Sequence, residues 1–111
     1  MFRSGIRAVK KMKYGLEDRV ITQIQSIFTQ FAQIEKVVLY GSRAKGTYKN
    51  GSDIDLCLFG KQLDRTLLYK VEDLLDDLYL PYSFDFSIYE DIENQDLKDH
   101  INREGIVFYK K

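Results

Sequence analysis

Apolar residues recur at helical spacing in two stretches of the chain. The first stretch follows Gly15, and the acidic residues Glu17 and Asp18 lie in its first turn, where the helix dipole favours negative charge. The second stretch runs from Leu63 to Leu78 and is closed by Pro81. We therefore predict two amphipathic helices. Their apolar positions are Val20, Ile24, Ile27, Phe28 and Phe31 in the first, and Leu63, Leu67, Leu68, Val71, Leu74, Leu75 and Leu78 in the second.

Short β-branched, aromatic or alternating runs predict strands between and after these helices. Residues 41–52 are rich in glycine, serine and asparagine and predict a loop with one short helical turn, and residues 91–104 are weakly helical. This order predicts an α+β domain (an α/β sandwich) with a small mixed sheet and helices covering one face. The predicted strands are residues 36–40, 53–59, 83–89 and 106–109.

Composition narrows the class of protein. A chain of 111 residues with 44% hydrophobic and 31% charged residues is typical of one globular domain. Seventeen basic and seventeen acidic residues cancel, which disfavours nucleic acid as the main ligand. One cysteine and one histidine exclude an intrachain disulfide, a cysteine-based zinc cage and a multi-histidine metal site. With no long apolar run and no signal peptide, we expect a cytoplasmic protein that does not enter a membrane.

The first residues carry positive charge only. We divide the chain into a basic N-terminal arm, residues 1–13, expected to be loosely ordered, and a single domain, residues 14–111. The arm can contact RNA or an acidic partner, or be a solvated tail, and Met12 can also be the native start. Its cations are Arg3, Arg7, Lys10, Lys11 and Lys13.

Two carboxylates share one face of the predicted strand 53–59. Alternation places Asp53 and Asp55 on the face that also carries Cys57, with aliphatic residues on the other face. Like charges this close repel each other, and a divalent cation between them relieves the repulsion. Oxygen ligands of this kind suit Mg²⁺ or Mn²⁺.

The strand 83–89 repeats the pattern. Asp85 alternates with phenylalanines and shares its face with Ser83 and Ser87. If both strands turn their apolar faces to the same helices, Asp85 joins the two other aspartates, and three carboxylates are the ligand set of two-metal phosphoryl or nucleotidyl transfer. The alternative is that each aspartate is an ordinary surface or turn residue. Acidic residues are depleted from strands, which favours the metal site.

The loop before these carboxylates has features of a phosphate site. Gly41 allows main-chain N–H groups to approach a phosphate, and a helix that begins at Ser42 directs its positive end at that phosphate. The Ser42 hydroxyl and the Arg43 guanidinium can donate to phosphate oxygens, although an ordinary turn has the same composition. The spacing of residues 41–46 also opens a P-loop, but Thr47 and Tyr48 stand where that motif requires lysine and then serine or threonine.

The string Tyr40-Gly41-Ser42, then ten intervening residues, then Asp53-Ile54-Asp55-Leu56 resembles the signature of the nucleotidyltransferase superfamily, which has the fold of DNA polymerase β. The fuller strings 41–46 and 51–56 are similar to those of the minimal nucleotidyltransferases (MNT proteins), which are often encoded beside a HEPN-domain protein as a toxin–antitoxin pair. The resemblance extends from about Tyr14 to the end of the chain and includes Asp85, with no departure at the signature positions.

The resemblance implies the role of each matching residue. Asp53 and Asp55 would hold two Mg²⁺ ions on a triphosphate, and Asp85 would share one metal and take the proton of the acceptor hydroxyl. In the antitoxin members, AMP passes from ATP to a tyrosine hydroxyl of the HEPN toxin. The implied nucleotide-binding residues are Gly41, Ser42, Arg43 and Ser52.

Three functions follow as hypotheses. The first is an adenylyltransferase that modifies a HEPN-type partner. The second is a non-catalytic module that masks a partner, and the third is a small-molecule (antibiotic) nucleotidyltransferase, although those enzymes carry a further helical domain. We expect the carboxylate face to stay open until a partner closes it, with Tyr48 and Tyr82 as interface anchors. We expect Cys57 to be a buried strand residue and His100 to face the surface or a partner.

Overall fold

The computed structural model describes residues 12–111; residues 1–11, most of the predicted arm, lie outside the described residues. The described chain begins with a small antiparallel hairpin. Strand β1 (Met12–Lys13) pairs with β2 (Leu16–Glu17) around Tyr14 and Gly15, which both have positive φ angles. The last two residues of the predicted arm are therefore part of a paired strand.

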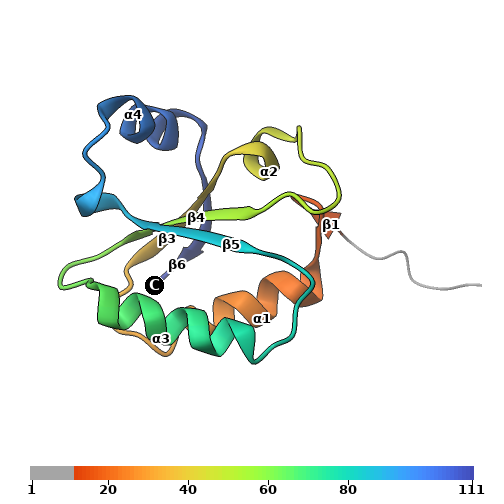
Figure 1. Cartoon of the computed structure of the whole chain (residues 1–111), viewed down its shortest axis with the longest axis horizontal. Helices are drawn as coiled ribbons and strands as arrows, with labels where there is room; N and C mark the ends of the chain where they lie inside the picture. Colours follow the sequence, from red (N-terminus) through yellow and green to blue (C-terminus); the bar gives the residue numbers. More distant parts are fainter. Residues whose placement is uncertain (1–11) are drawn as a thin grey trace, which may run out of the picture.

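A four-stranded mixed sheet forms the centre of the molecule, as predicted (Figure 1). Its spatial order is β5-β4-β3-β6. Strand β3 pairs antiparallel with β4 and β6, whereas β4 and β5 are parallel. The sheet strands are β3 (Lys36–Tyr40), β4 (Ile54–Phe59), β5 (Phe84–Ile88) and β6 (Ile106–Lys110).

Within residues 12–111, four α-helices connect the strands, and the predicted helices are all present. Side-chain caps start two of them: Asp64 accepts a hydrogen bond of 2.8 Å from the N–H of Leu67, and Asn94 accepts one of 3.1 Å from the N–H of Leu97. The helices are α1 (Asp18–Phe28), α2 (Ser42–Lys45), α3 (Arg65–Asp76) and α4 (Gln95–Glu104), with a 3₁₀ turn, η1 (Tyr89–Asp91), before α4.

The second long helix ends earlier than its apolar pattern predicts. Helix α3 stops at Asp76, five positions before Pro81, and the chain then turns through Tyr79, which has a φ of 52°. A left-handed residue cannot continue a right-handed helix. Leu78 and Leu80 still pack against the core from this connecting segment.

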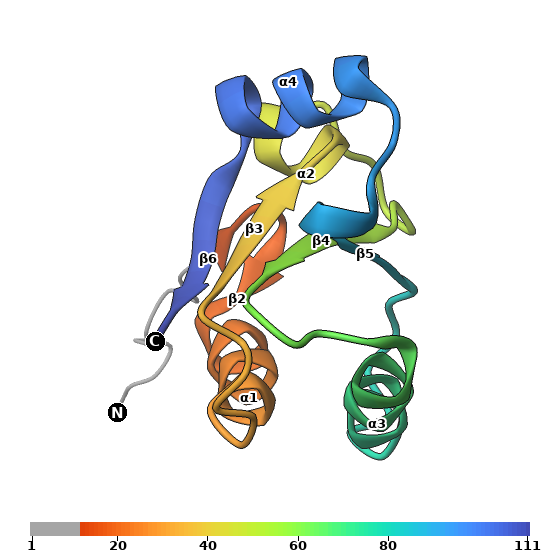
Figure 2. The ribbon, with the colours of Figure 1, turned by 90° about the vertical axis from the view of Figure 1, so that its left-hand side faces the viewer.

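The two long helices cover one face of the sheet (Figure 2). Helices α1 and α3 pack against the aliphatic face of β4, which buries Ile54, Leu56 and Leu58 completely. The predicted face assignment of this strand is therefore correct. The remaining buried members of this core are Leu16, Val20, Ile21, Ile24, Ile27, Phe28, Ile34, Val37, Leu39, Leu67, Leu68, Val71, Leu75 and Phe108.

The opposite face is not wholly open, which corrects our expectation. Helix α4 lies on this side of the sheet in Figure 2, and its Ile101 packs with Val38 and Cys57 in a second buried cluster. Val38 and Cys57 are partners across β3 and β4, so they form an apolar patch that a helix buries. Burial raises the pKa of Cys57 to about 11, so the thiol is protonated at neutral pH, as expected for a buried strand cysteine.

Within residues 12–111 no helix is long and apolar enough to cross a membrane.

Candidate active site

Two of the predicted site carboxylates lie side by side in the sheet. Asp55 pairs with Tyr40 of the antiparallel strand β3 and with Asp85 of the parallel strand β5. Residues paired across neighbouring strands point to the same face, so Tyr40, Asp55 and Asp85 form one transverse row, which we call the carboxylate row. Asp53 precedes β4 and is exposed. The strand register thus brings together residues that are thirty positions apart in sequence.

The charges of the three aspartates act on one another. The pKa of Asp55 is raised above its usual range, first by burial and then by the negative charges of Asp85 and Asp53, while the positive charge of Arg43 opposes the shift. A raised carboxyl pKa means that the folded chain binds this proton more tightly than the unfolded chain. The ionised Asp55 therefore costs folding free energy at neutral pH, and a positive charge at this position would recover it.

These carboxylates fit a divalent cation by their chemistry. Oxygen ligands with mutual repulsion are the donor set that Mg²⁺ or Mn²⁺ takes in proteins. As the side chains stand, no three histidine, cysteine, aspartate or glutamate groups within the described chain converge on a single point where an ion would sit. The predicted ligands Asp53, Asp55 and Asp85 are thus close enough to interact electrostatically but are not a closed coordination cage.

Position 41, where the loop after β3 begins, must be glycine because Asp55 lies against it. Gly41 has a φ of 76° and a ψ of −154°, which only glycine adopts without strain, and it lies directly before α2. A Cβ atom at this position would overlap Oδ2 of Asp55. Gly41 therefore brings the main chain of the loop against the carboxylate row. Ser42 is the first residue of α2 and is half-buried.

Arg43 is held by internal contacts, and its predicted contact with phosphate stays a prediction. Its side chain is only 3% exposed, and its nitrogens donate to main-chain carbonyls: Nη1 to Tyr14 at 2.8 Å, Nη2 to Ser52 at 2.9 Å, and Nε to Ser52 at 3.1 Å. The guanidinium also lies 5.4 Å from the ring centre of Tyr48 and 5.2 Å from that of Tyr82. Arg43 therefore connects the N-terminal hairpin to the loop before β4.

This role makes a prediction about stability. Replacing Arg43 with methionine should lower the free energy of unfolding by about 2–4 kcal/mol, because the carbonyls of Tyr14 and Ser52 lose their donors in a buried site. Urea unfolding measures this change, with Lys45→Met, an exposed position on the same helix, as the control. An unchanged free energy of unfolding together with a raised KM for ATP would instead support the predicted contact of Arg43 with phosphate.

Ser52 also contributes to the structure of the loop. Its Oγ accepts a hydrogen bond of 2.8 Å from the N–H of Lys49, and its carbonyl accepts from Arg43. These bonds close the turn that leads into Asp53. The hydroxyl of Ser52 keeps its own hydrogen for donation, so the predicted contact with a nucleotide stays a prediction.

Sequence reasoning placed Ser87 on the face of Asp85 without a role, gave Tyr40 no specific role, and did not bring His100 to the carboxylate row. The hydroxyl of Tyr40 lies 3.3 Å from Oγ of Ser87, and burial raises the pKa of Tyr40, with further contributions from Asp85 and Asp55. His100 of α4 meets the ring of Tyr40 edge-on, with 6.5 Å between ring centres. The signal for Ser87 was its place two residues after Asp85 on the same strand. Nothing local predicts His100, because the approach of α4 depends on the tertiary fold.

The comparisons with known proteins agree with this arrangement. Residues 22–111 match the model of the family described as "Polymerase beta, Nucleotidyltransferase". No curated protein matches the chain. Among solved structures, the chain is similar to a toxin–antitoxin complex with AMP-PNP, at 18% identity and a TM-score of 0.67, over 82% of this chain and 73% of that chain.

Two further structures have the same fold. One is a tri-AMPylated Shewanella oneidensis HEPN toxin in complex with MNT antitoxin, at 14% identity and a TM-score of 0.61, over 84% of this chain and 71% of that chain. The other is a putative nucleotidyltransferase from Sulfolobus solfataricus, at 21% identity and a TM-score of 0.53, over 84% of this chain and 82% of that chain. Identities this low show the fold alone, and they confirm the predicted polymerase β-like architecture.

Proposed function

The chain belongs to the polymerase β nucleotidyltransferase family, and we propose that it transfers AMP from ATP to a hydroxyl of a HEPN-type partner protein, as the antitoxin of a toxin–antitoxin pair. The observation that carries the proposal is the carboxylate row: Asp55 and Asp85 lie in register on adjacent strands, and burial, followed by the charges of Asp85 and Asp53, raises the pKa of Asp55. Carboxylates that repel one another at a shifted pKa are typical of functional sites, and a divalent cation would relieve the repulsion.

The reaction is a substitution at the α-phosphorus of ATP. The oxygen of the acceptor hydroxyl, a tyrosine in our proposal, forms the new bond to this phosphorus. The bond from the phosphorus to the bridging oxygen breaks, and pyrophosphate leaves. The carboxylate of Asp85 takes the proton of the hydroxyl. Asp85 is exposed on the edge strand β5, so the acceptor can reach it.

Asp53 and Asp55, with Asp85, would hold two Mg²⁺ ions, or Mn²⁺, which when bound neutralise triphosphate charge and orient the reacting oxygens. Gly41 and Ser42 would form the phosphate side of the site. The first N–H groups of α2 have no partners within the helix, and the conformation of Gly41 leaves the main chain uncovered by a side chain.

The partner is proposed from the structural neighbours. Their descriptions name toxin–antitoxin complexes, one with AMP-PNP and one with a tri-AMPylated HEPN toxin beside an MNT antitoxin. This chain contains the fold shared with those complexes. The presence of Asp53, Asp55 and Asp85 together favours a catalytic antitoxin over one that only masks its partner, because masking requires no such set of carboxylates.

Pyrophosphate release tests the proposal against its two alternatives. The chain is incubated with ATP and Mg²⁺, first with a HEPN-domain partner protein and then with a panel of aminoglycosides. We expect release only with the protein partner. Formation of a tight complex without any release would support masking, and robust release with an aminoglycoside alone would support the small-molecule alternative.

A further inference from the structure

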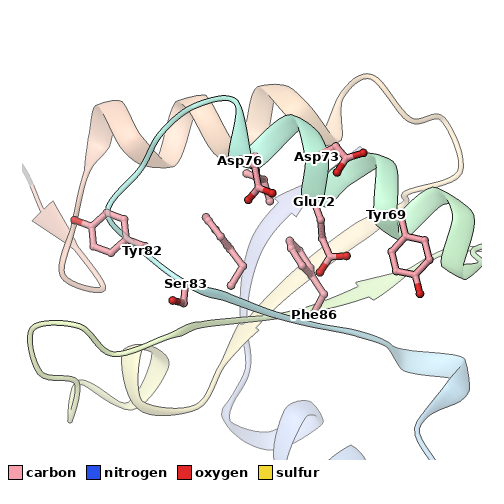
Figure 3. Close-up of a pocket in the computed structure, with 9 residues that line it drawn as sticks. Tyr69, Glu72, Asp73, Asp76, Tyr82, Ser83 and Phe86 are labelled. Carbon is pink, nitrogen blue, oxygen red and sulfur yellow. The ribbon is translucent and has the colours of Figure 1, made fainter.

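A pocket of about 560 Å³ lies between α3 and β5, on the side of the sheet away from the carboxylate row. Phe84 and Phe86 of β5 form its apolar floor, with their rings nearly parallel and 5.9 Å apart. Figure 3 shows Tyr82 and Tyr69 at its two ends. We call this pocket the α3–β5 groove. Its side chains carry no part of the chemistry proposed above.

One wall of the α3–β5 groove is acidic. Glu72, Asp73 and Asp76 lie with Tyr69 on one face of α3, at spacings of three, four and seven residues. Glu72 is half-buried, whereas the two aspartates are exposed. None of the residues that line the groove, all of them within the described chain, is basic. The groove therefore favours a positively charged occupant and repels phosphate.

The floor of the groove belongs to an edge strand. Strand β5 is the last strand of the sheet, and no strand within residues 12–111 pairs with its outer side. An unpaired edge offers main-chain donors and acceptors to an added strand. Side chains alternate along β5, so Phe84 and Phe86 face the groove while Asp85 faces the carboxylate row. A segment bound along this edge would reach both faces of β5.

We propose that the α3–β5 groove binds an extended segment of the acceptor protein that carries arginine or lysine at alternating positions; this proposal rests on the proposed function. Glu72, Asp73 and Asp76 pair with the cations, and Tyr69 offers a ring face to a guanidinium. The segment adds to the free edge of β5, about 4.8 Å from it. The acceptor is thereby anchored next to Asp85. Its hydroxyl is modified on the opposite face of β5, where the Asp85 side chain lies.

The test measures peptide binding by fluorescence anisotropy with the full chain. The probe is a short labelled peptide in which arginine and valine alternate, and a glutamate–valine peptide is the charge control. We expect the arginine peptide to bind, the glutamate peptide not to bind, and the affinity to fall as NaCl is added. The triple variant Glu72→Gln/Asp73→Asn/Asp76→Asn should bind about tenfold more weakly. Glu90→Gln/Glu93→Gln/Glu104→Gln, exposed residues outside the groove, is the matched control and should bind like wild type.

Binding and catalysis separate the two proposals. Asp85→Asn should bind the arginine peptide normally and lose AMP transfer, so a failure of transfer alone leaves the groove proposal intact. Equal binding by the triple variant and wild type would overturn the groove proposal. A tenfold gain in affinity for the arginine peptide on removal of residues 1–11 would indicate that the basic start of this chain occupies the groove. That result would likewise overturn the proposal of an external occupant.

Discussion

Replacing Asp55 with asparagine should abolish AMP transfer while the fold is kept. We expect the rate to fall by about 10³-fold, because the variant removes a carboxylate from the centre of the charge-stabilising site. The Asp55→Asn variant should unfold at the same or a higher temperature than wild type at pH 7, since the repulsion from Asp85 and Asp53 disappears. Asp53→Asn should lose transfer in the same way. Rate and melting temperature are measured on the same preparations.

The stabilisation of the fold by Asp55→Asn should depend on pH. The raised pKa of Asp55 makes its ionisation unfavourable in the folded chain, so the cost is absent below the ordinary aspartate pKa of about 3.9 and grows as the pH rises through the raised value. The stabilisation by Asp55→Asn should therefore be present at pH 7 and vanish in acid. Mg²⁺ should raise the melting temperature of wild type, and it should raise the melting temperature of Asp55→Asn much less. Asp77→Asn, an exposed carboxylate at the end of α3, is the control. Full activity of Asp55→Asn would refute the site, and an unfolded variant would assign Asp55 a structural role.

The second large effect is expected from Gly41→Ala. Alanine at a φ of 76° is strained, and its Cβ would overlap Oδ2 of Asp55, so the loop and the carboxylate must move apart. A displacement of about 1 Å in a transferase site costs about 10²-fold in rate. We therefore expect transfer to fall by about this factor, with weaker use of ATP. Steady-state kinetics with ATP as the varied substrate measures both changes.

Gly46→Ala is the matched control for this variant. Gly46 has a φ of 84° at the end of α2, but a Cβ there meets nothing within 4 Å. Alanine at this left-handed position is therefore strained less than at Gly41, and it does not displace Asp55. Ser42→Ala, which removes one hydroxyl next to the glycine, should weaken ATP use only modestly. Equal activity of Gly41→Ala and Gly46→Ala would show that the loop does not need to approach Asp55.

Much of the fold follows from local patterns in the chain. The alternation of Asp55 with Ile54 and Leu56 predicts which face of β4 meets the long helices, because burial of the aliphatic side chains decides the orientation of the strand. The same reasoning applied to Phe84 and Asp85 places Asp85 on the polar face. That β4 and β5 are neighbours with Asp55 opposite Asp85 is a matter of tertiary pairing, which alternation does not specify.

At Arg43, α4 and His100 the structure adds what the sequence did not predict, and the cause in each case is contact between distant segments. Arg43 in a glycine-rich loop has the appearance of a free phosphate ligand, but the hairpin around Tyr14 and the ring of Tyr82 enclose it. The apolar stripe of α4 is short, and its place on the carboxylate face depends on the patch formed by Val38 and Cys57. His100 arrives at Tyr40 with that helix.

Intact-mass spectrometry of the partner tests the central claim most directly. The HEPN-type protein is incubated with ATP, Mg²⁺ and either wild-type chain or Asp85→Asn, and complex formation is verified for both. Our account predicts that wild type adds one or more AMP units to the partner and that Asp85→Asn adds none while still binding it. An unmodified partner with wild type, or equal modification by Asp85→Asn, would contradict the account.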